Sequence, residues 1–183
     1  MFEHFPRLDK KITKSLDPVL FFFHKKLKLK PSCLSLLSGL FGFLAILFIW
    51  INQWILGLVF IIISQIFDVL DGQVAKKYNL KSKKGYFLDF TIDKLIEFGL
   101  IFSFAFLNKV GIRLAVLAAI TLAFLSLAQR KTKFDIGFKK IGMFAGYLIG
   151  FNLAFLLVII SNIIGIVGTL IILLKNKTKL KLL

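Results

Sequence analysis

Residues 54–93 read WILGLVFIIISQIFDVLDGQVAKKYNLKSKKGYFLDFTID, a stretch that joins a long apolar run to four aspartates and a lysine-rich loop. The run stays uncharged up to Asp68, and its length predicts a helix over 54–75 that crosses a bilayer. The loop over 76–84 leads into a second predicted helix over 85–107. Because the loop is short, we expect the two helices to be antiparallel neighbours, with acidic residues at the ends that the loop joins.

Three other apolar regions predict the remaining membrane helices. Residues 34–50 and 111–128 are each long enough to cross a bilayer once. Residues 141–174 carry no charge, and at a rise of about 1.5 Å per residue they suffice for two short spans. We place the turn between these two spans at Ser161–Asn162. The expected fold class is an all-α integral membrane protein with six transmembrane helices.

The overall composition supports a membrane protein. The chain has 183 residues, of which 58% are hydrophobic, and yet its formal net charge is +16. A soluble single domain of this size could not bury so much apolar surface. The basic residues form short clusters between apolar runs, which is typical of membrane loops and anionic-lipid contacts, so we expect membrane lipid and no nucleic acid as a partner. With one cysteine, Cys33, no intrachain disulfide can form.

The basic segment 1–30 contains a predicted amphipathic helix. Asp17 followed by Pro18 has the pattern of an N-cap and a first-turn proline. Apolar residues recur behind it at helical spacing, and lysines occupy the other positions. We therefore expect this helix to lie on the membrane surface. Its apolar positions are Val19, Leu20, Phe23 and Leu27.

The distribution of positive charge predicts how the chain is oriented. Nearly all of the 25 Lys and Arg residues lie in the segments 1–30, 76–84 and 130–140 and in the C-terminal tail. With six spans, all of these segments fall on one side of the membrane, which the positive-inside rule identifies as cytoplasmic. Both termini are thus expected in the cytoplasm. We divide the chain into the basic segment 1–30, a six-helix domain over 31–175 and a basic cytoplasmic tail over 176–183.

Acidic residues are scarce and concentrated in the predicted membrane helices. The chain has 9 of them, and a cluster lies within thirty residues: Asp68, Asp71, Asp89, Asp93 and Glu97. A carboxylate in a membrane helix costs about 2.5–3.5 kcal/mol on insertion scales. The spacings of three and four residues place each aspartate pair on one helix face, so the four carboxylates can converge. A hard divalent cation, Mg²⁺ or Mn²⁺, is the natural compensating partner.

Small residues beside the aspartates suit a phosphate ligand. Gly72 directly follows Asp71 and leaves the backbone open to a ligand, and Ala75 keeps the same surface open one turn later. Gly85 begins the next helix, where its small size again permits close approach. The lysines of the loop can neutralise a pyrophosphate.

The complete pattern resembles the signature of the CDP-alcohol phosphatidyltransferase family. It reads Asp68-x2-Asp71-Gly72-x2-Ala75-Lys76-x8-Gly85-x3-Asp89-x3-Asp93, and the family has Arg where this chain has Lys76. The resemblance extends over most of the chain. It implies a membrane enzyme that moves a phosphatidyl-type group from a CDP-linked lipid, such as CDP-diacylglycerol, to a small alcohol and releases CMP. It also implies two Mg²⁺ or Mn²⁺ ions and a homodimer.

The resemblance assigns roles to individual residues. It implies that Asp68, Asp71 and Asp89 ligate metal, and that Asp93 completes the cluster and acts as the general base. The positions implied to contact the CDP-lipid are Ser32, Ser35, Gly72, Ala75, Lys76, Ser82 and Gly85. Ser32 and Ser35 replace the Asn and Thr of the family's Pro-Asn-x-x-Thr pattern. The arginine pair that many relatives use for phosphorylated acceptors is missing, and its substitutes here would be Arg130, Lys139 and Lys140.

Two other functions remain open from the residues alone. Carboxylates in membrane helices can belong to the ion pathway of a small transporter. An inactive relative that kept the fold is the second alternative, favoured by Lys76 and by the serines at 32 and 35 and opposed by the four aspartates. The acceptor also remains open among inositol, inositol phosphate, glycerol phosphate, serine and other small alcohols, and the start of the first helix resembles that of relatives that use inositol-type acceptors. The lipid, diacylglycerol or archaeol, is not determined.

Overall fold

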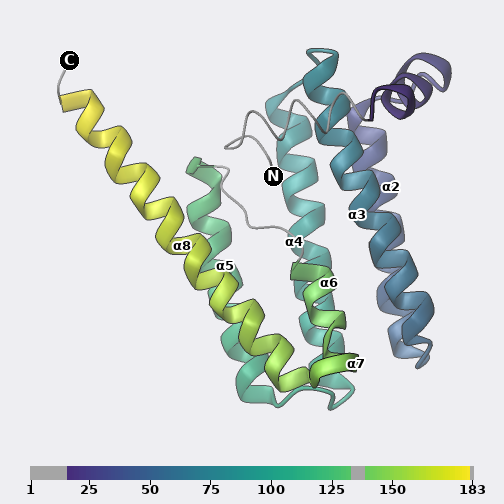
Figure 1. The fold of residues 1–183 in the computed structure, drawn as a ribbon, viewed down its shortest axis with the longest axis vertical. Coiled ribbons are helices and arrows are strands. Elements are labelled where there is room, and N and C mark those ends of the chain that lie inside the picture. The colour runs from purple at the N-terminus through teal and green to yellow at the C-terminus, as the bar shows by residue number, and fades with distance from the viewer. Residues whose placement is uncertain (1–15, 133–138, 182–183) are drawn as a thin grey trace. The chain divides into compact units, whose positions relative to one another are not determined.

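The computed structural model describes residues 16–132 and 139–181, which are helical with short connections and contain no strand (Figure 1). The chain divides into two compact units, and the boundary lies between Ile96 and Glu97, inside one continuous helix. The predicted all-α class is therefore confirmed.

The N-terminal unit contains the aspartate motif. Residues 16–21 are helical and continue into a short π-helix, η1 (Phe22–Lys26). The long helices α2 (Pro31–Trp50) and α3 (Trp54–Lys77) follow, and the first part of α4 (Lys83–Phe106) completes the unit. Helices α2 and α3 run antiparallel and side by side (Figure 1). The predicted spans over 34–50, 54–75 and 85–107 correspond to these three helices.

Local sequence explains where these helices begin and end. Pro31 occupies the first turn of α2, where its missing N–H is not needed. Asn52, Asn79 and Asn108 follow the ends of α2, α3 and α4 with φ values of 59°, 56° and 55°. This left-handed conformation is one that asparagine adopts more easily than most residues, so each asparagine marks a helix end.

A small apolar core joins the N-terminal helix to α2 and α3. Leu20 is buried against Leu34, Leu70 and Val74, and Phe23 packs at the edge of this cluster. The predicted apolar face is only partly correct, because Val19 and Leu27 are exposed. The predicted N-cap at Asp17 is also wrong: Leu16 is already helical, and the Asp17 carboxylate instead forms an ion pair with Lys77 at 3.0 Å.

Helix α4 approaches α2 closely because α2 carries glycines at the contact. A Cβ added at Gly39 would lie 2.9 Å from Ile92, and one added at Gly42 would lie 2.3 Å from Ile96. Both distances are too short for a real side chain, so the two glycines make room for the isoleucine side chains of α4. This packing holds the aspartates of α4 beside α2 within the N-terminal unit.

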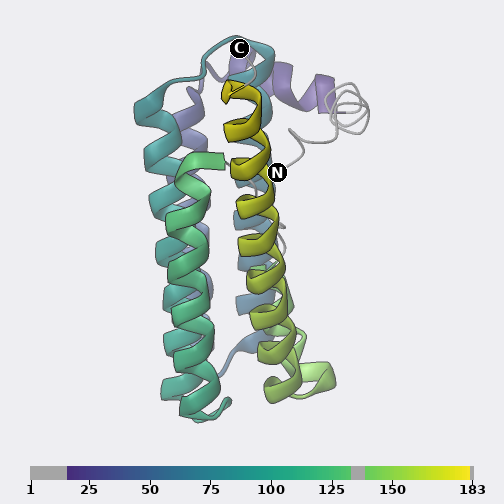
Figure 2. The same ribbon diagram turned by 90° about the vertical axis from the view of Figure 1, so that its left-hand side faces the viewer.

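The C-terminal unit contains the rest of α4, α5 (Ile112–Thr132), α6 (Lys139–Phe144), α7 (Gly146–Ile149) and α8 (Phe151–Lys181). Helices α5 and α8 lie side by side (Figure 2). Around Phe104 of α4, aromatic rings from the other helices form a cluster: Phe144, Tyr147, Phe151 and Phe155.

The predicted turn at Ser161–Asn162 is wrong. Both residues lie inside the continuous helix α8, and the chain turns instead at Gly150, whose φ of 88° is accessible to glycine. Asn162 is fully buried and donates a hydrogen bond to the Thr121 hydroxyl of α5 at 3.2 Å. A polar residue inside an apolar run therefore joins two helices here and does not end one.

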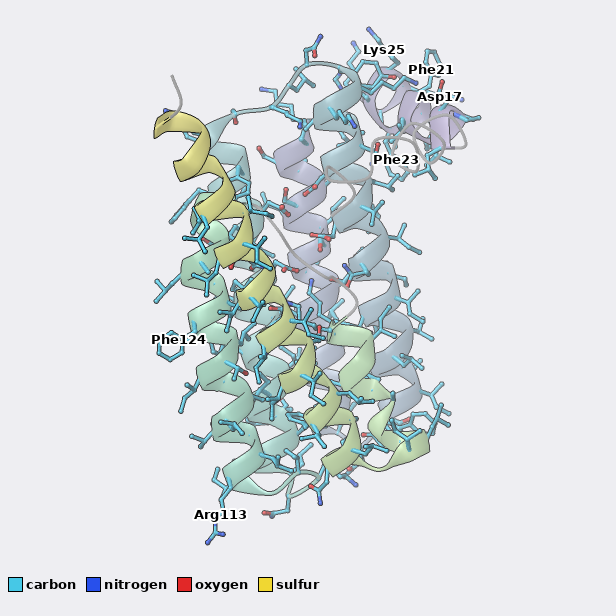
Figure 3. The ribbon with its side chains drawn as sticks, turned by 60° about the vertical axis from the view of Figure 1, so that its left-hand side comes forward. Asp17, Phe21, Phe23, Lys25, Arg113 and Phe124 are labelled. Carbon is cyan, nitrogen blue, oxygen red and sulfur yellow. The ribbon has the colours of Figure 1, made fainter. Side chains whose placement is uncertain are left out.

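Among the residues that the structure describes, four helices are long and apolar enough to cross a membrane: α2, α3, α5 and α8. In each of these helices at most a third of the most apolar stretch is buried inside the protein, and many of its large apolar side chains are exposed. Phe124, for example, points outward from α5 and is 62% exposed (Figure 3). So much exposed apolar surface is stable only in lipid, and the chain is an integral membrane protein.

The other two predicted crossings do not combine sufficient length with an apolar composition. Helix α4 has sufficient length but carries the charged residues of the motif. Helices α6 and α7 cover residues 139–149, which rise about 16 Å, half of the hydrocarbon core. The count of six crossings therefore stays a prediction. The backbone of the predicted tail over 176–183 is helical up to Lys181, as the continuation of α8.

Candidate active site

The motif residues meet at the end of the N-terminal unit where α3 ends and α2 and α4 begin. Asp68 and Asp71 lie in the last turns of α3, and Asp89 and Asp93 lie in the first half of α4. Asp71 is the most enclosed of the four, with 4% of its surface exposed, and the other three are partly buried.

Asp71 is the centre of a group of polar contacts. The hydroxyl of Ser35 on α2 donates a hydrogen bond to the Asp71 carboxylate. The carboxyl group of Asp89 is close enough to interact with that of Asp71, and the negative charge of Asp68 also acts on Asp71. Three of the four predicted ligands are therefore electrostatic neighbours. Two carboxyl groups can lie this close only when a proton or a cation compensates their charge.

The other two aspartates are each engaged by a neighbour on the same helix. The side-chain amide of Gln65 donates a hydrogen bond to Asp68 at 3.1 Å, and the ammonium of Lys94 lies 3.6 Å from Asp93. The sequence interpretation assigned no role to Gln65 or Lys94. The three-residue spacing between Gln65 and Asp68 was the signal that could have identified the first pair.

The four carboxylates do not surround one common point in this conformation. Within the part of the chain that the structure describes, no group of three or more Asp, Glu, His or Cys side chains is placed to hold a metal ion. Asp71 and Asp89 are brought together, and the four-carboxylate metal site stays a prediction.

Gly72 leaves an open surface next to Asp71. A Cβ added at this position would meet no atom within 4 Å, and the residue is exposed. Packing inside the protein therefore does not require glycine here. A requirement for glycine at this position would have to come from a ligand. Ala75 and Lys76 follow on the last turn of α3, both partly exposed.

The serines and Gly85 gather where α4 begins. The hydroxyl of Ser82 accepts a hydrogen bond from the Gly85 amide at 3.0 Å and so caps the first turn of α4. A Cβ on Gly85 would lie 3.0 Å from the Ser82 hydroxyl and 3.8 Å from that of Ser32. Ser82 and Ser35 thus have structural partners, a helix end and Asp71, and their predicted contacts with a CDP group remain predictions.

The lysines predicted to bind the acceptor belong to the C-terminal unit. Lys139 is buried and lies 3.7 Å from the equally buried carboxylate of Glu97. Lys140, the next residue, is 2% exposed. The side chain of Arg130 lies outside the described residues. The ion pair neutralises the charge of Lys139, and acceptor binding by these residues is untested.

The ion pair predicts a specific response to mutation. Replacing Lys139 with methionine is expected to destabilise the protein by about 3–5 kcal/mol, because it leaves the buried carboxylate of Glu97 without its cation. The double variant Lys139→Met with Glu97→Gln should recover most of the loss. Thermal unfolding in detergent measures both effects. Equal losses in the single and double variants would contradict a coupled pair.

Comparisons with known proteins identify a family and a similar fold. The model of the CDP-alcohol phosphatidyltransferase family matches residues 28–175. An uncharacterized protein of Aquifex aeolicus (strain VF5) is 29% identical over 82 residues, which are 45% of this chain and 41% of that relative, so the match spans less than half of the relative's length. The crystal structure of Mycobacterium tuberculosis phosphatidylinositol phosphate synthase (PgsA1) with CDP-DAG bound has a similar fold, with a TM-score of 0.63 and 16% identity over 90% of this chain and 92% of that one.

Proposed function

Since the chain belongs to the CDP-alcohol phosphatidyltransferase family, we propose that it transfers a phosphatidyl-type group from a CDP-linked lipid to a small alcohol and releases CMP. The observation that carries the proposal is the contact of Asp71 with Asp89 and Ser35, beside the open surface of Gly72. The bound CDP-DAG of the Mycobacterium tuberculosis protein supports a CDP-linked lipid as the donor.

The residues present fit a divalent cation. Asp71 and Asp89 are close enough to interact, a cation would compensate their charge, and both offer the oxygen ligands that Mg²⁺ and Mn²⁺ prefer. We propose that Asp68, Asp71, Asp89 and Asp93 hold two such ions. When bound, the ions would polarise the phosphoryl group of the donor and neutralise its charge.

The protein's own residues then have separate tasks. Asp93 accepts the proton of the acceptor hydroxyl, whose oxygen forms a bond to the lipid-linked phosphorus. The bond between that phosphorus and the CMP oxygen breaks, and Lys76 stabilises the negative charge on the departing CMP. Gly72 and Ala75 leave room for the nucleotide, and the hydroxyls of Ser32, Ser35 and Ser82 lie at the same end of the unit, where they would contact the CDP group.

We propose an inositol-type alcohol as the first acceptor to test, with Arg130, Lys139 and Lys140 as its candidate contacts. The ion pair between Lys139 and Glu97 reduces the charge that this region offers to a phosphorylated acceptor. A homodimer also stays a prediction.

The decisive experiment supplies purified protein in lipid nanodiscs with radiolabelled CDP-diacylglycerol or CDP-archaeol, Mg²⁺ or Mn²⁺, and a panel of alcohols. We expect CMP release that requires the metal ion and one class of alcohol. If no alcohol supported CMP release from either donor, the proposed function would be overturned. Cation flux in liposomes without CMP release would identify a transporter.

The membrane arrangement belongs to the same proposal. We propose that α4 and the α6–α7 segment complete six crossings, and that the helix over residues 16–26 lies on the cytoplasmic membrane surface. Its exposed residues support this position: Phe21 and Phe22 are exposed, Phe21 and Lys25 project from the same short helix (Figure 3), and the ammonium of Lys26 lies 5.6 Å from the centroid of the Phe22 ring.

This arrangement predicts that both termini lie on the same side. A reporter that is active only in the cytoplasm should be active when it is fused to the N-terminus and also when it is fused to the C-terminus, because an even number of crossings returns the chain to its starting side. A fusion at Lys109, between α4 and α5, should report the opposite side. Termini on opposite sides would contradict six crossings.

A further inference from the structure

Gln65 lies one turn before Asp68 on α3 and contacts it directly. Its side-chain nitrogen donates a hydrogen bond to one carboxylate oxygen of Asp68 at 3.1 Å. Hydrogen bonds from neighbouring residues fix the orientation of carboxylates that bind metals, and such partners affect metal affinity strongly. Gln65 is therefore placed to set the orientation of a proposed ligand.

The other half of the same amide has an unsatisfied acceptor. The amide must present its nitrogen to the carboxylate, because the carbonyl oxygen cannot donate. In this orientation the carbonyl oxygen of Gln65 is the free end of the amide. It is buried, and it has no hydrogen-bond partner among the residues that the structure describes. A buried acceptor without a donor costs free energy, so this oxygen would be stabilised by a donor that enters with a ligand.

We propose that Gln65 is a positioning residue for the metal site: its nitrogen orients Asp68, and its carbonyl oxygen would accept a hydrogen bond from a donor that enters with the metal ion. This inference rests on the proposed function. The simpler interpretation is a helix pair of the i,i+3 type that contributes only to local stability. The two interpretations differ in whether replacement of Gln65 weakens binding of the metal ion.

The neighbouring residue offers a matched control. Ser64 is buried on the same turn of α3, and its hydroxyl forms a hydrogen bond with that of Ser38 on α2 at 3.2 Å. The variant Ser64→Ala removes a polar contact between α3 and α2 and leaves the side chains of Gln65 and Asp68 unchanged. It reports what the loss of a structural hydrogen bond does by itself.

The experiment measures Mn²⁺ binding to the full chain in nanodiscs by electron paramagnetic resonance, together with the rate of CMP release as Mn²⁺ is varied. In Gln65→Met, which keeps side-chain length but removes donor and acceptor, we expect about 10–100-fold weaker Mn²⁺ binding. Saturating Mn²⁺ should restore most of the maximal rate. Gln65→Asn, whose amide is one methylene shorter, should show a smaller loss and carries the test if Gln65→Met does not fold.

The outcomes separate the two proposals. If the wild-type protein releases CMP and Gln65→Met binds Mn²⁺ as tightly as the wild type, the role of Gln65 is overturned and the proposed function stands. The role is also overturned if Ser64→Ala weakens Mn²⁺ binding as much as Gln65→Met does. If the wild-type protein neither binds Mn²⁺ nor releases CMP, both proposals are overturned.

Discussion

Replacing Asp93 with asparagine is expected to lower the rate of CMP release by about 10²–10⁴-fold, the range for loss of a general base. Asparagine has nearly the same shape as aspartate but cannot accept the proton of the acceptor hydroxyl. The side chain of Asp93 is partly exposed on α4, and its ion-pair partner is the adjacent Lys94 at 3.6 Å. Because asparagine keeps the size of the side chain, we expect the fold to be retained, which thermal unfolding in detergent can verify.

Two further measurements make the Asp93 result specific. Asp17→Asn removes a carboxylate that is paired with Lys77 in the same unit, and it should leave the rate of CMP release unchanged. Mn²⁺ binding to Asp93→Asn separates the two proposed roles of the carboxylate: binding near the wild-type level indicates a base, and a parallel loss of binding indicates mainly a ligand. Full activity in Asp93→Asn would remove Asp93 as the base.

Replacing Gly72 with alanine is expected to lower the rate with the CDP-lipid by about 10²-fold without destabilising the protein. An added Cβ meets no protein atom within 4 Å, and alanine in a helix is more stable than glycine by about 0.5–1 kcal/mol. The melting temperature should hence stay the same or rise. The same methyl group would occupy the surface where the nucleotide is proposed to approach, and a displacement of about 1 Å can cost about 10²-fold in rate.

Gly111 provides the control for this prediction. A Cβ at Gly111 also meets nothing within 4 Å, but this glycine lies before α5, in the other unit and outside the aspartate motif of the sequence. Gly111→Ala should keep both stability and CMP release. The kinetic constants for CDP-lipid in the two variants are the measurement, and equal activity of Gly72→Ala and the wild type would contradict a ligand at Gly72.

The length of an apolar run predicted most of the helices within a few residues. The spans expected over 34–50, 54–75, 85–107 and 111–128 appear as α2, α3, α4 and α5. This agreement has a local cause, because in a membrane each helix must satisfy its own backbone hydrogen bonds and its length must match the bilayer. The spacing of the aspartates likewise predicted shared helix faces, since helical periodicity is local.

The interactions of polar residues could not be predicted in this way. Asn162 suggested a turn, but its partner Thr121 lies on another helix, and the turn occurs at Gly150. Ser35 was predicted to contact the nucleotide, and in the structure its hydroxyl donates a hydrogen bond to Asp71. In both cases the same side chain suits more than one environment, and the neighbour that decides is distant in sequence.

By itself, then, the sequence determined the class of the protein, the extent of its first four long helices and the aspartate motif, because these depend on apolar length and helical period. Only the tertiary structure decided which other polar groups meet: Ser35 with Asp71, and Lys139 with Glu97. The physical reason is that a buried polar or charged group must find a partner wherever packing brings one within reach, and that partner is set by the fold as a whole.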